Sequence, residues 1–134
     1  MFGVLDTSTS ALVAQRVRLE TIAANLANAN SIYDAQGNYS PYRRRVPVFA
    51  PGDPTTGNAS GVHVARILID DSPLRPVYEP GHPHADANGY VYYPNIDPTM
   101  EQINALEASR AYEANIVAAE ATKSMIQASL RLLA

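Results

Sequence analysis

Apolar residues recur at heptad spacing at both ends of the chain. Near the N-terminus, leucines stand seven residues apart at Leu5, Leu12, Leu19 and Leu26. Near the C-terminus, a partly polar row with the same spacing runs through Ile103, Arg110, Val117, Ser124 and Arg131. All ten prolines lie between Pro41 and Pro98, and six of the seven glycines lie between Gly37 and Gly89. Because these residues break helices, the pattern predicts a helix at each end and none between them.

The first helix is expected over residues 5–29. Asp6–Ser10 offers several N-cap candidates before Ala11, and Asn28 and Asn30 mark its end. Three further apolar residues lie off the leucine row, at Val13, Val17 and Ala24. The apolar stripe of this helix is therefore wide or double.

The last helix is expected to begin at Thr99, a candidate N-cap after Pro98, and to run uninterrupted to the end of the chain. One stripe follows Met100, Ile103, Glu107, Arg110, Ala114, Val117, Ala121, Met125, Ala128 and Leu132. A second apolar set lies on other faces, at Leu106, Ile116, Ile126, Leu130 and Leu133. A helix that is apolar on more than one side needs more than one neighbour. We therefore expect assembly with other chains, and poorly ordered helix ends when the chain is alone.

The segment between the helices predicts a small β-rich module, rich in proline and glycine. Val62–Ile69 alternates along a strand, and Gly89–Tyr93 is β-branched and aromatic. Pro41–Phe49 is a further candidate, which Pro47 restricts to an edge or a bulge. The predicted fold class is α+β, with the terminal helices packing as a coiled-coil-like pair. The predicted parts are 1–30, an N-terminal assembly helix, 31–98, the β-rich module, and 99–134, a C-terminal assembly helix.

Composition and charge exclude several classes of function. The 134 residues carry a net charge of −3 and no cysteine, which excludes disulfides, thiol catalysis and cysteine-based metal sites. The charge is spread along the chain, so no nucleic-acid partner is expected. No apolar run approaches a membrane span, so no membrane insertion is expected. The first residues lack a basic segment followed by a continuous apolar stretch, so a cleaved secretory signal is not expected either.

Three stretches resemble the flagellar basal-body rod proteins. They are NLANAN at Asn25–Asn30, PLRPVYEPGHPHADANGYVYYPNID at Pro73–Asp97 and SRAYEANIVAAEATKSM at Ser109–Met125. The first is shared by rod and hook proteins in general, whereas the second is similar to one proximal-rod member. With a similar stretch around Pro41–Phe49, the resemblance covers nearly the whole chain, and only Ser31–Ser40 and Pro51–Ser60 lack a strong family pattern.

The resemblance implies a structural subunit rather than an enzyme, located in the periplasm-spanning proximal rod that transmits torque for motility. It implies contacts with copies of itself, with other rod subunits and with the junction between the membrane ring and the rod. It also implies export by the flagellar type III apparatus, and peptidoglycan lies close to such a rod. The alternative is a coiled-coil adaptor or binding module unrelated to flagella, which would form a defined dimer or trimer.

Contacts between subunits are expected on both helices. The expected helix-packing residues are Leu5, Leu12, Gln15, Arg16, Leu19, Ile22, Asn25, Leu26, Asn28, Ile103, Arg110, Tyr112, Ala114, Val117, Ala121, Met125 and Leu132. Asn25 is expected to fix helix register and Asn30 to cap the helix. Arg110 lies on the apolar stripe, where it either bonds a neighbouring subunit or belongs to a solvated face. Expected contacts of the middle module are Arg43, Arg44, Arg45, Tyr78 and Tyr90.

Chemical sites have little support in the sequence. His82, His84 and Asp86 alternate and could bind a metal together with His63, but Pro83 disturbs the strand and favours a polar loop. Asp70 and Asp71 would diverge on a strand, which makes them a poor acid and base pair. Arg43–Arg45 carries too little charge for strong binding of nucleic acid. No catalytic residue, metal or cofactor is therefore expected.

Overall fold

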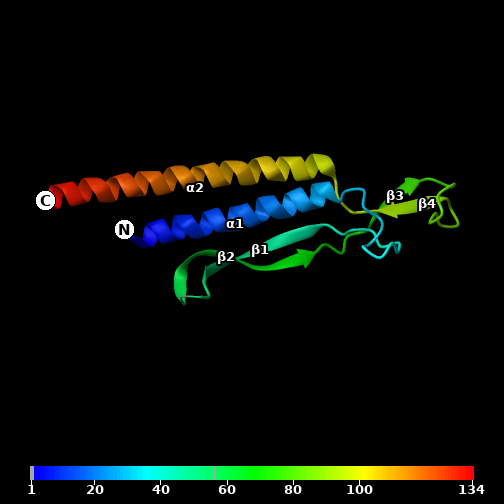
Figure 1. Ribbon diagram of the computed structural model, residues 1–134, viewed down its shortest axis with the longest axis horizontal. Coiled ribbons are helices and arrows are strands. Elements are labelled where there is room, and N and C mark those ends of the chain that lie inside the picture. Colours follow the sequence, from blue (N-terminus) through cyan, green and yellow to red (C-terminus); the bar gives the residue numbers. More distant parts are fainter. Residues whose placement is uncertain (1, 56) are drawn as a thin grey trace.

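The computed structural model describes residues 2–55 and 57–134 of the chain. The order of its elements is α1 (Phe2–Ala27), β1 (Arg45–Asp53), β2 (Asn58–Ile69), β3 (Arg75–Tyr78), β4 (Tyr90–Tyr93) and α2 (Pro98–Leu133). The two helices run antiparallel and side by side, and the strands β1 and β2 lie along the other side of α1 (Figure 1). The short hairpin of β3 and β4 lies at the end of the molecule far from both termini (Figure 1). The α+β class is confirmed.

The first helix begins earlier than the sequence indicates. The N-cap predicted within Asp6–Ser10 is wrong, because α1 already starts at Phe2. Hydroxyl groups inside the helix bond backward to its own backbone: Thr7 donates to the carbonyl of Gly3 at 2.8 Å, and Ser10 donates to that of Thr7 at 2.7 Å. Such bonds let short polar side chains sit within a helix instead of capping it. The helix ends at Ala27, two residues before the predicted end at residue 29.

The last helix also begins differently from the prediction. The N-cap is Asp97 and not Thr99, because the Asp97 carboxylate accepts the Thr99 N–H at 3.0 Å. Pro98 occupies the first turn, where its missing N–H leaves no unpaired donor. From there α2 runs without interruption to Leu133, as predicted.

The strands form two separate antiparallel sheets of two strands each, β1 with β2 and β3 with β4. We call the first pair the ribbon and the second the hairpin. The predicted strand at Val62–Ile69 is confirmed and extends back to Asn58, whereas β1 begins at Arg45 instead of Pro41 and continues to Asp53. Pro47 lies in β1, at the edge of a sheet of two strands, as predicted. The short strand β3 was missed.

The core of the molecule is small and rich in alanine. Its buried apolar residues, within the described ranges, are Ala14, Ile22, Ala29, Ile32, Val91, Ile96 and Ala108. Of the described helices and strands, α2 packs against α1 alone, whereas α1 also packs against β1 and β2. The molecule is thus built in three layers, α2, α1 and the ribbon, with α1 in the middle (Figure 1).

Candidate assembly surfaces

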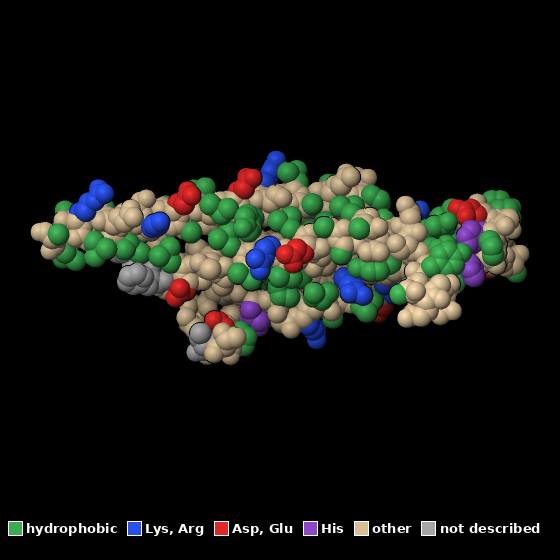
Figure 2. Space-filling view, viewed as in Figure 1, with side chains coloured by type: hydrophobic (Ala, Val, Ile, Leu, Met, Phe, Trp, Pro, Cys, Tyr) green, Lys and Arg blue, Asp and Glu red, His purple; other side chains and the backbone are tan. Residues whose placement is uncertain are grey.

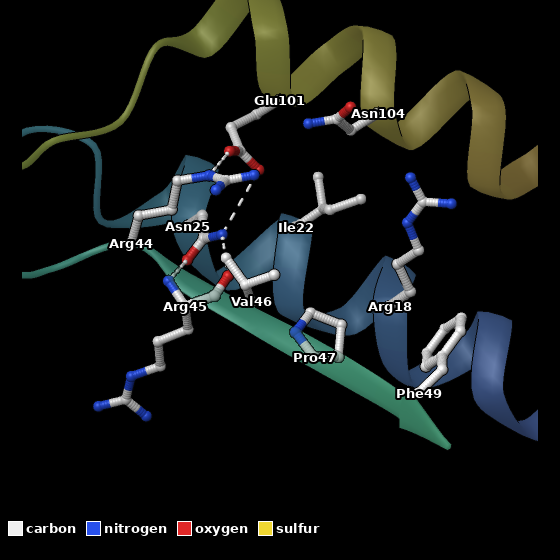
Figure 3. Close-up of a pocket in the computed structure, with 10 residues that line it drawn as sticks. All are labelled: Arg18, Ile22, Asn25, Arg44, Arg45, Val46, Pro47, Phe49, Glu101 and Asn104. Atoms are coloured by element: carbon white, nitrogen blue, oxygen red, sulfur yellow. Dashed lines mark hydrogen bonds and ion pairs between the residues drawn. The ribbon is translucent and has the colours of Figure 1, made fainter. Parts of the chain in front are cut away.

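A buried polar cluster joins the end of α1 to the starts of β1 and α2 (Figure 3). We call Asn25, Arg44 and Glu101 with their partners the polar junction. Asn25 is 1% exposed, and its amide accepts the Arg45 N–H at 3.0 Å and donates to the Arg45 carbonyl at 2.9 Å. The side chain therefore pairs with β1 as a neighbouring strand would. Its amide nitrogen also lies 3.4 Å from the Glu101 carboxylate, which links α1 to α2.

The ion pair of Arg44 and Glu101 joins the residue before β1 to α2. The Arg44 guanidinium donates to the Glu101 carboxylate, which is only 1% exposed, and lies 3.6 Å from the Asp70 carboxylate. The Arg44 backbone N–H donates to the Asn95 side chain at 2.9 Å. Hydrogen bonds from Ser72, together with Arg44, hold the pKa of Asp70 below its ordinary value. A buried charge is tolerated when it is paired and hydrogen-bonded in this way.

Beside the junction lies a hollow of about 370 Å³ between α1, β1 and α2 (Figure 3). Its lining residues are Arg18, Ile22, Asn25, Arg44, Arg45, Val46, Pro47, Phe49, Glu101 and Asn104. Two of its arginines are paired within the chain, since Arg18 lies 3.6 Å from Glu107 and Arg44 binds Glu101, whereas Arg45 is exposed and contacts the Tyr42 ring. The hollow is a gap in the packing of three elements, and its polar side chains hold those elements together.

The residues predicted on α1 lie mostly inside the chain. Ile22 and Asn25 are buried, and six others are half-buried, namely Leu5, Leu12, Gln15, Leu19, Leu26 and Asn28. Arg16 is exposed and lies 3.8 Å from Glu20. Within the described residues, the Gln15 side-chain oxygen is buried and has no hydrogen-bond partner. This row packs largely against elements of its own chain, and its contact with other subunits stays a prediction.

The predicted stripe on α2 faces away from α1. We call it the outer stripe, and all of its residues are exposed, namely Met100, Ile103, Glu107, Arg110, Ala114, Val117, Ala121, Met125, Ala128 and Leu132. Ala108 is 0% exposed and Val117 is 63% exposed. These two lie nine residues apart, which at about 100° per residue places them on opposite sides of the helix. Tyr112, the remaining predicted residue of α2, is half-buried.

The C-terminal part of α2 projects beyond α1 (Figure 1). The helices have 36 and 26 residues, and the excess lies at the end where both termini are found. Leu132 and Leu133 there are 88% and 85% exposed. Apolar side chains are visible along much of the α2 surface (Figure 2). The chain by itself leaves this helix largely uncovered.

Of the residues predicted as contacts of the middle module, some are bonded within the chain and others are exposed. Arg44 belongs to the polar junction, which its spacing in Arg43–Arg45 did not show. Arg43 donates to the Ser72 carbonyl at 3.0 Å, and Arg45 is exposed, with its guanidinium 5.3 Å from the Tyr42 ring centre. Tyr78 and Tyr90 are exposed on the hairpin, with ring centres 5.4 Å apart. Arg45, Tyr78 and Tyr90 therefore remain available for contact with a partner.

Glu101 is the residue of the polar junction that the sequence did not single out as a contact. It stands at the N-terminal turn of α2, where an exposed carboxylate would interact with the helix dipole. The sequence around Glu101 does not distinguish an exposed carboxylate from a buried one, because its partner Arg44 lies far away in the sequence. The signal in the sequence was Arg44 itself, the middle one of three consecutive arginines within the predicted strand Pro41–Phe49, where alternate side chains point to opposite faces.

Of the candidate metal ligands, His82 and His84 lie together between β3 and β4, with ring centres 5.7 Å apart, and His63 belongs to a different sheet. His63 lies in the ribbon, with its Nδ1 2.8 Å from the Gly52 carbonyl oxygen. His84 stacks on Tyr39 with ring centres 4.7 Å apart at the other end of the molecule. A hydrogen bond from the Tyr90 N–H lowers the pKa of Asp86. Within residues 2–55 and 57–134, no three side chains of His, Cys, Asp or Glu are gathered around a possible metal position.

A membrane-spanning helix is likewise not found in the described part of the chain. Neither α1 nor α2 combines the length and the apolar character that crossing a bilayer requires.

Comparison with known proteins gives matches over nearly the whole chain. The family described as flagella basal body rod protein matches residues 5–31, and the C-terminal family of flagellar basal body rod FlgEFG proteins matches residues 87–132. The chain is 44% identical to the flagellar basal-body rod protein FlgC of Salmonella typhimurium over 136 residues, which cover 98% of this chain and 97% of the relative. It is 40% identical to FlgC of Bacillus subtilis, with the same coverage.

Proposed function

This chain belongs to the FlgC family of flagellar basal-body rod proteins, and on that basis we propose that the outer stripe of α2 is the main surface through which it joins the rod. The protein is a structural subunit of the flagellar basal-body rod and not an enzyme. As such it assembles with other rod components. The proposal concerns which residues make those contacts.

The exposure of the whole outer stripe is the observation that carries the proposal. Val117, Met125 and Ile103 are all more than half exposed in the single chain. Burying an aliphatic side chain of this size contributes about 1.5–3 kcal/mol, so several such residues supply enough free energy for a stable contact. A continuous exposed apolar surface of this length marks an interface. Arg110, inside the stripe, adds a charge that a partner must match, which favours one register.

The two helices are proposed to act as a coiled-coil-like pair that presents this stripe. The leucines of α1 recur every seven residues, as they do in helices that pack along their length. In the single chain α1 and α2 already run antiparallel and in contact. Torque transmission would then depend on many such contacts resisting shear. The division into assembly helices at 1–30 and 99–134 and a middle module at 31–98 is part of the same proposal.

Replacing Val117 by Asp tests the proposed surface. Because Val117 is 63% exposed, the Val117→Asp variant should fold and accumulate as the normal chain does, yet support no swimming in a strain that lacks its own copy. The matched control is Gln127→Asp, also exposed on α2 but outside the outer stripe, which should leave swimming unchanged. Normal swimming of the Val117→Asp strain would contradict the proposal.

The remaining partners rest on family membership. We propose contact with the junction between the membrane ring and the rod, and export by the flagellar type III apparatus, because rod proteins share a place of assembly. The Arg43–Arg45 cluster, in which Arg45 is exposed, is proposed to contact another subunit or anionic peptidoglycan.

A further inference from the structure

The layered build gives the molecule two unlike outer surfaces on opposite sides. Because α1 lies between α2 and the ribbon, the outer stripe of α2 and the far side of the ribbon cannot meet within one chain (Figure 1). A subunit with two different exposed surfaces, facing opposite ways, can contact the next copy through unlike patches. Such contacts produce rings or helical filaments, and not closed symmetric dimers.

The C-terminal end of β2 is the apolar part of the ribbon surface. Ile67, Leu68 and Ile69 are 50%, 42% and 61% exposed. Since successive side chains of a strand point to opposite faces, aliphatic surface is left uncovered on both faces of this end. The sheet has only two strands, so β2 also has an edge that β1 does not occupy. Long apolar edge strands of this kind are normally covered by another element. We call Ile67–Ile69 the ribbon end.

The charges around the ribbon end are mainly positive. Arg45 pairs with Ile69 across the ribbon, Arg66 precedes the three aliphatic residues, and both are exposed. Arg43 lies nearby and is half-buried, and Asp71 is an exposed carboxylate of opposite sign. Arg44 and Asp70 are already paired inside the polar junction. The ribbon end therefore combines aliphatic side chains with an excess of positive charge.

The central part of α2 has the opposite charge. Between residues 107 and 120, its exposed charged residues are Arg110, Glu113, Glu120 and Glu107, of which Glu107 already lies 3.6 Å from Arg18 of the same chain. They flank the aliphatic side chains of Ala114 and Val117 in the outer stripe. Its surface therefore matches the ribbon end in both respects, since aliphatic groups would face aliphatic groups and carboxylates would face guanidinium groups.

We propose that the ribbon end of one copy docks on the central outer stripe of α2 of the next copy. The inference rests on the proposed role of the outer stripe and names the surface that covers it. The contact would be directional, since each copy gives its ribbon end to one neighbour and its α2 to another. The ribbon packs only against α1 among the described helices and strands, so a contact at its uncovered end would also stabilise it.

The absence of cysteine from the sequence allows a direct test by disulfide cross-linking. Chains carry one cysteine in the ribbon end, Leu68→Cys or Ile69→Cys, together with one in α2, Ala114→Cys, Val117→Cys or Ala121→Cys. All five positions are exposed, so the substitutions should leave the fold intact. Single-cysteine chains are first scored for swimming, and pairs are built from those that swim. Basal bodies are then isolated, oxidised and separated by non-reducing electrophoresis.

The expected result is a ladder of linked dimers, trimers and higher multiples in at least one pair. Each single-cysteine chain should stay monomeric, and so should the control that combines Ala87→Cys of the hairpin loop with the same α2 cysteines. Basal bodies that contain the chain but give no ladder in any pair would overturn the inference. Links only between like positions, ribbon to ribbon or α2 to α2, would overturn it too. Neither failure would touch the proposed role of α2, which the Val117→Asp strain tests separately.

Discussion

Asn25 shows how one side chain can connect elements that are distant in the sequence. The motif that begins at Asn25 ends the helix, and a polar residue in a heptad row was expected to fix the register against a partner helix. In the structure its amide instead binds the N–H and the carbonyl of Arg45, and approaches Glu101. The residue does fix register, but between α1 and β1 of its own chain. The position of Asn25 in the sequence indicated that it fixes register, but it did not identify the element that Asn25 binds.

Replacing Asn25 by Ala should expose the Arg45 amide. The partly buried N–H and carbonyl of Arg45 would lose their partner, at a cost of about 2 kcal/mol. Hydrogen exchange of the Arg45 amide should then be roughly thirtyfold faster, since about 1.4 kcal/mol corresponds to a factor of ten. The control is Asn28→Ala, whose side chain bonds the Ala24 carbonyl within the same helix end and should change the Arg45 amide little. Equal exchange in both variants would show that Asn25 does not hold β1.

At the scale of elements, prolines and heptads located both helices. The first residue of each helix instead depends on which nearby side chain bonds to the backbone. Asp97 caps α2 because its carboxylate accepts the Thr99 N–H, and Thr7 and Ser10 bond to their own helix instead of capping α1. The short strand β3 contains Pro76, which argues against a strand, and becomes one only through its pairing with β4. A strand as short as β3 shows no clear alternation of apolar and polar residues, so its pairing with a distant segment cannot be predicted from its own sequence.

The sequence located an apolar stripe on α2 but not the residue that is fully buried. The stripe with Ile103, Val117 and Met125 is exposed, and the buried Ala108 belongs to neither predicted set. In the second set, two residues are half-buried, Ile116 and Ile126, and three are exposed, Leu106, Leu130 and Leu133. Small residues let two helix backbones approach closely, so an alanine face packs well although it buries little area. Whether a row of larger side chains faces a second subunit depends on the assembled rod. The local sequence of one chain does not reveal it.

The turn of the hairpin depends on a glycine with a positive φ. Gly89 has φ of 85°, and a Cβ there would lie 2.9 Å from the Tyr78 ring and 3.2 Å from Pro80. Gly37 has φ of 83°, but a Cβ there would meet no atom within 4 Å. Gly37→Ala should therefore cost about 1 kcal/mol, for the backbone conformation alone.

Gly89→Ala should cost more, about 2 kcal/mol, because it adds a steric clash to the same backbone strain. The clash would also push Tyr78 away from Tyr90, whose ring centre is 5.4 Å distant. The measurement is the thermal midpoint followed by the near-ultraviolet circular dichroism of the tyrosines, with Gly37→Ala as the matched control. Equal midpoints for the two variants would mean that the hairpin turn has room for a side chain.

At the scale of the whole molecule, stability is concentrated at one end of the helix pair. The polar junction joins the end of α1, the start of α2 and the start of β1, and Ile22 is buried beside it. Farther along α2, within the described residues, no side chain beyond Ala108 is fully buried. Beyond Ala108 the side chains of α2 are half-buried or exposed, and a helix loses its order first where it is packed least.

We therefore expect the dilute, isolated chain to be largely monomeric and less helical than the 26 and 36 residues of α1 and α2 would allow. Amides near Glu101 should exchange slowest, and those of α2 beyond Val117 should exchange as fast as in an unfolded peptide. Helicity measured by circular dichroism should rise on assembly, because the outer stripe then gains the neighbour that ordering requires. Two fully formed helices that melt cooperatively in the dilute monomer would contradict this. Such a result would mean that the contacts between α1 and α2 suffice, and that assembly uses a surface already in place instead of creating it.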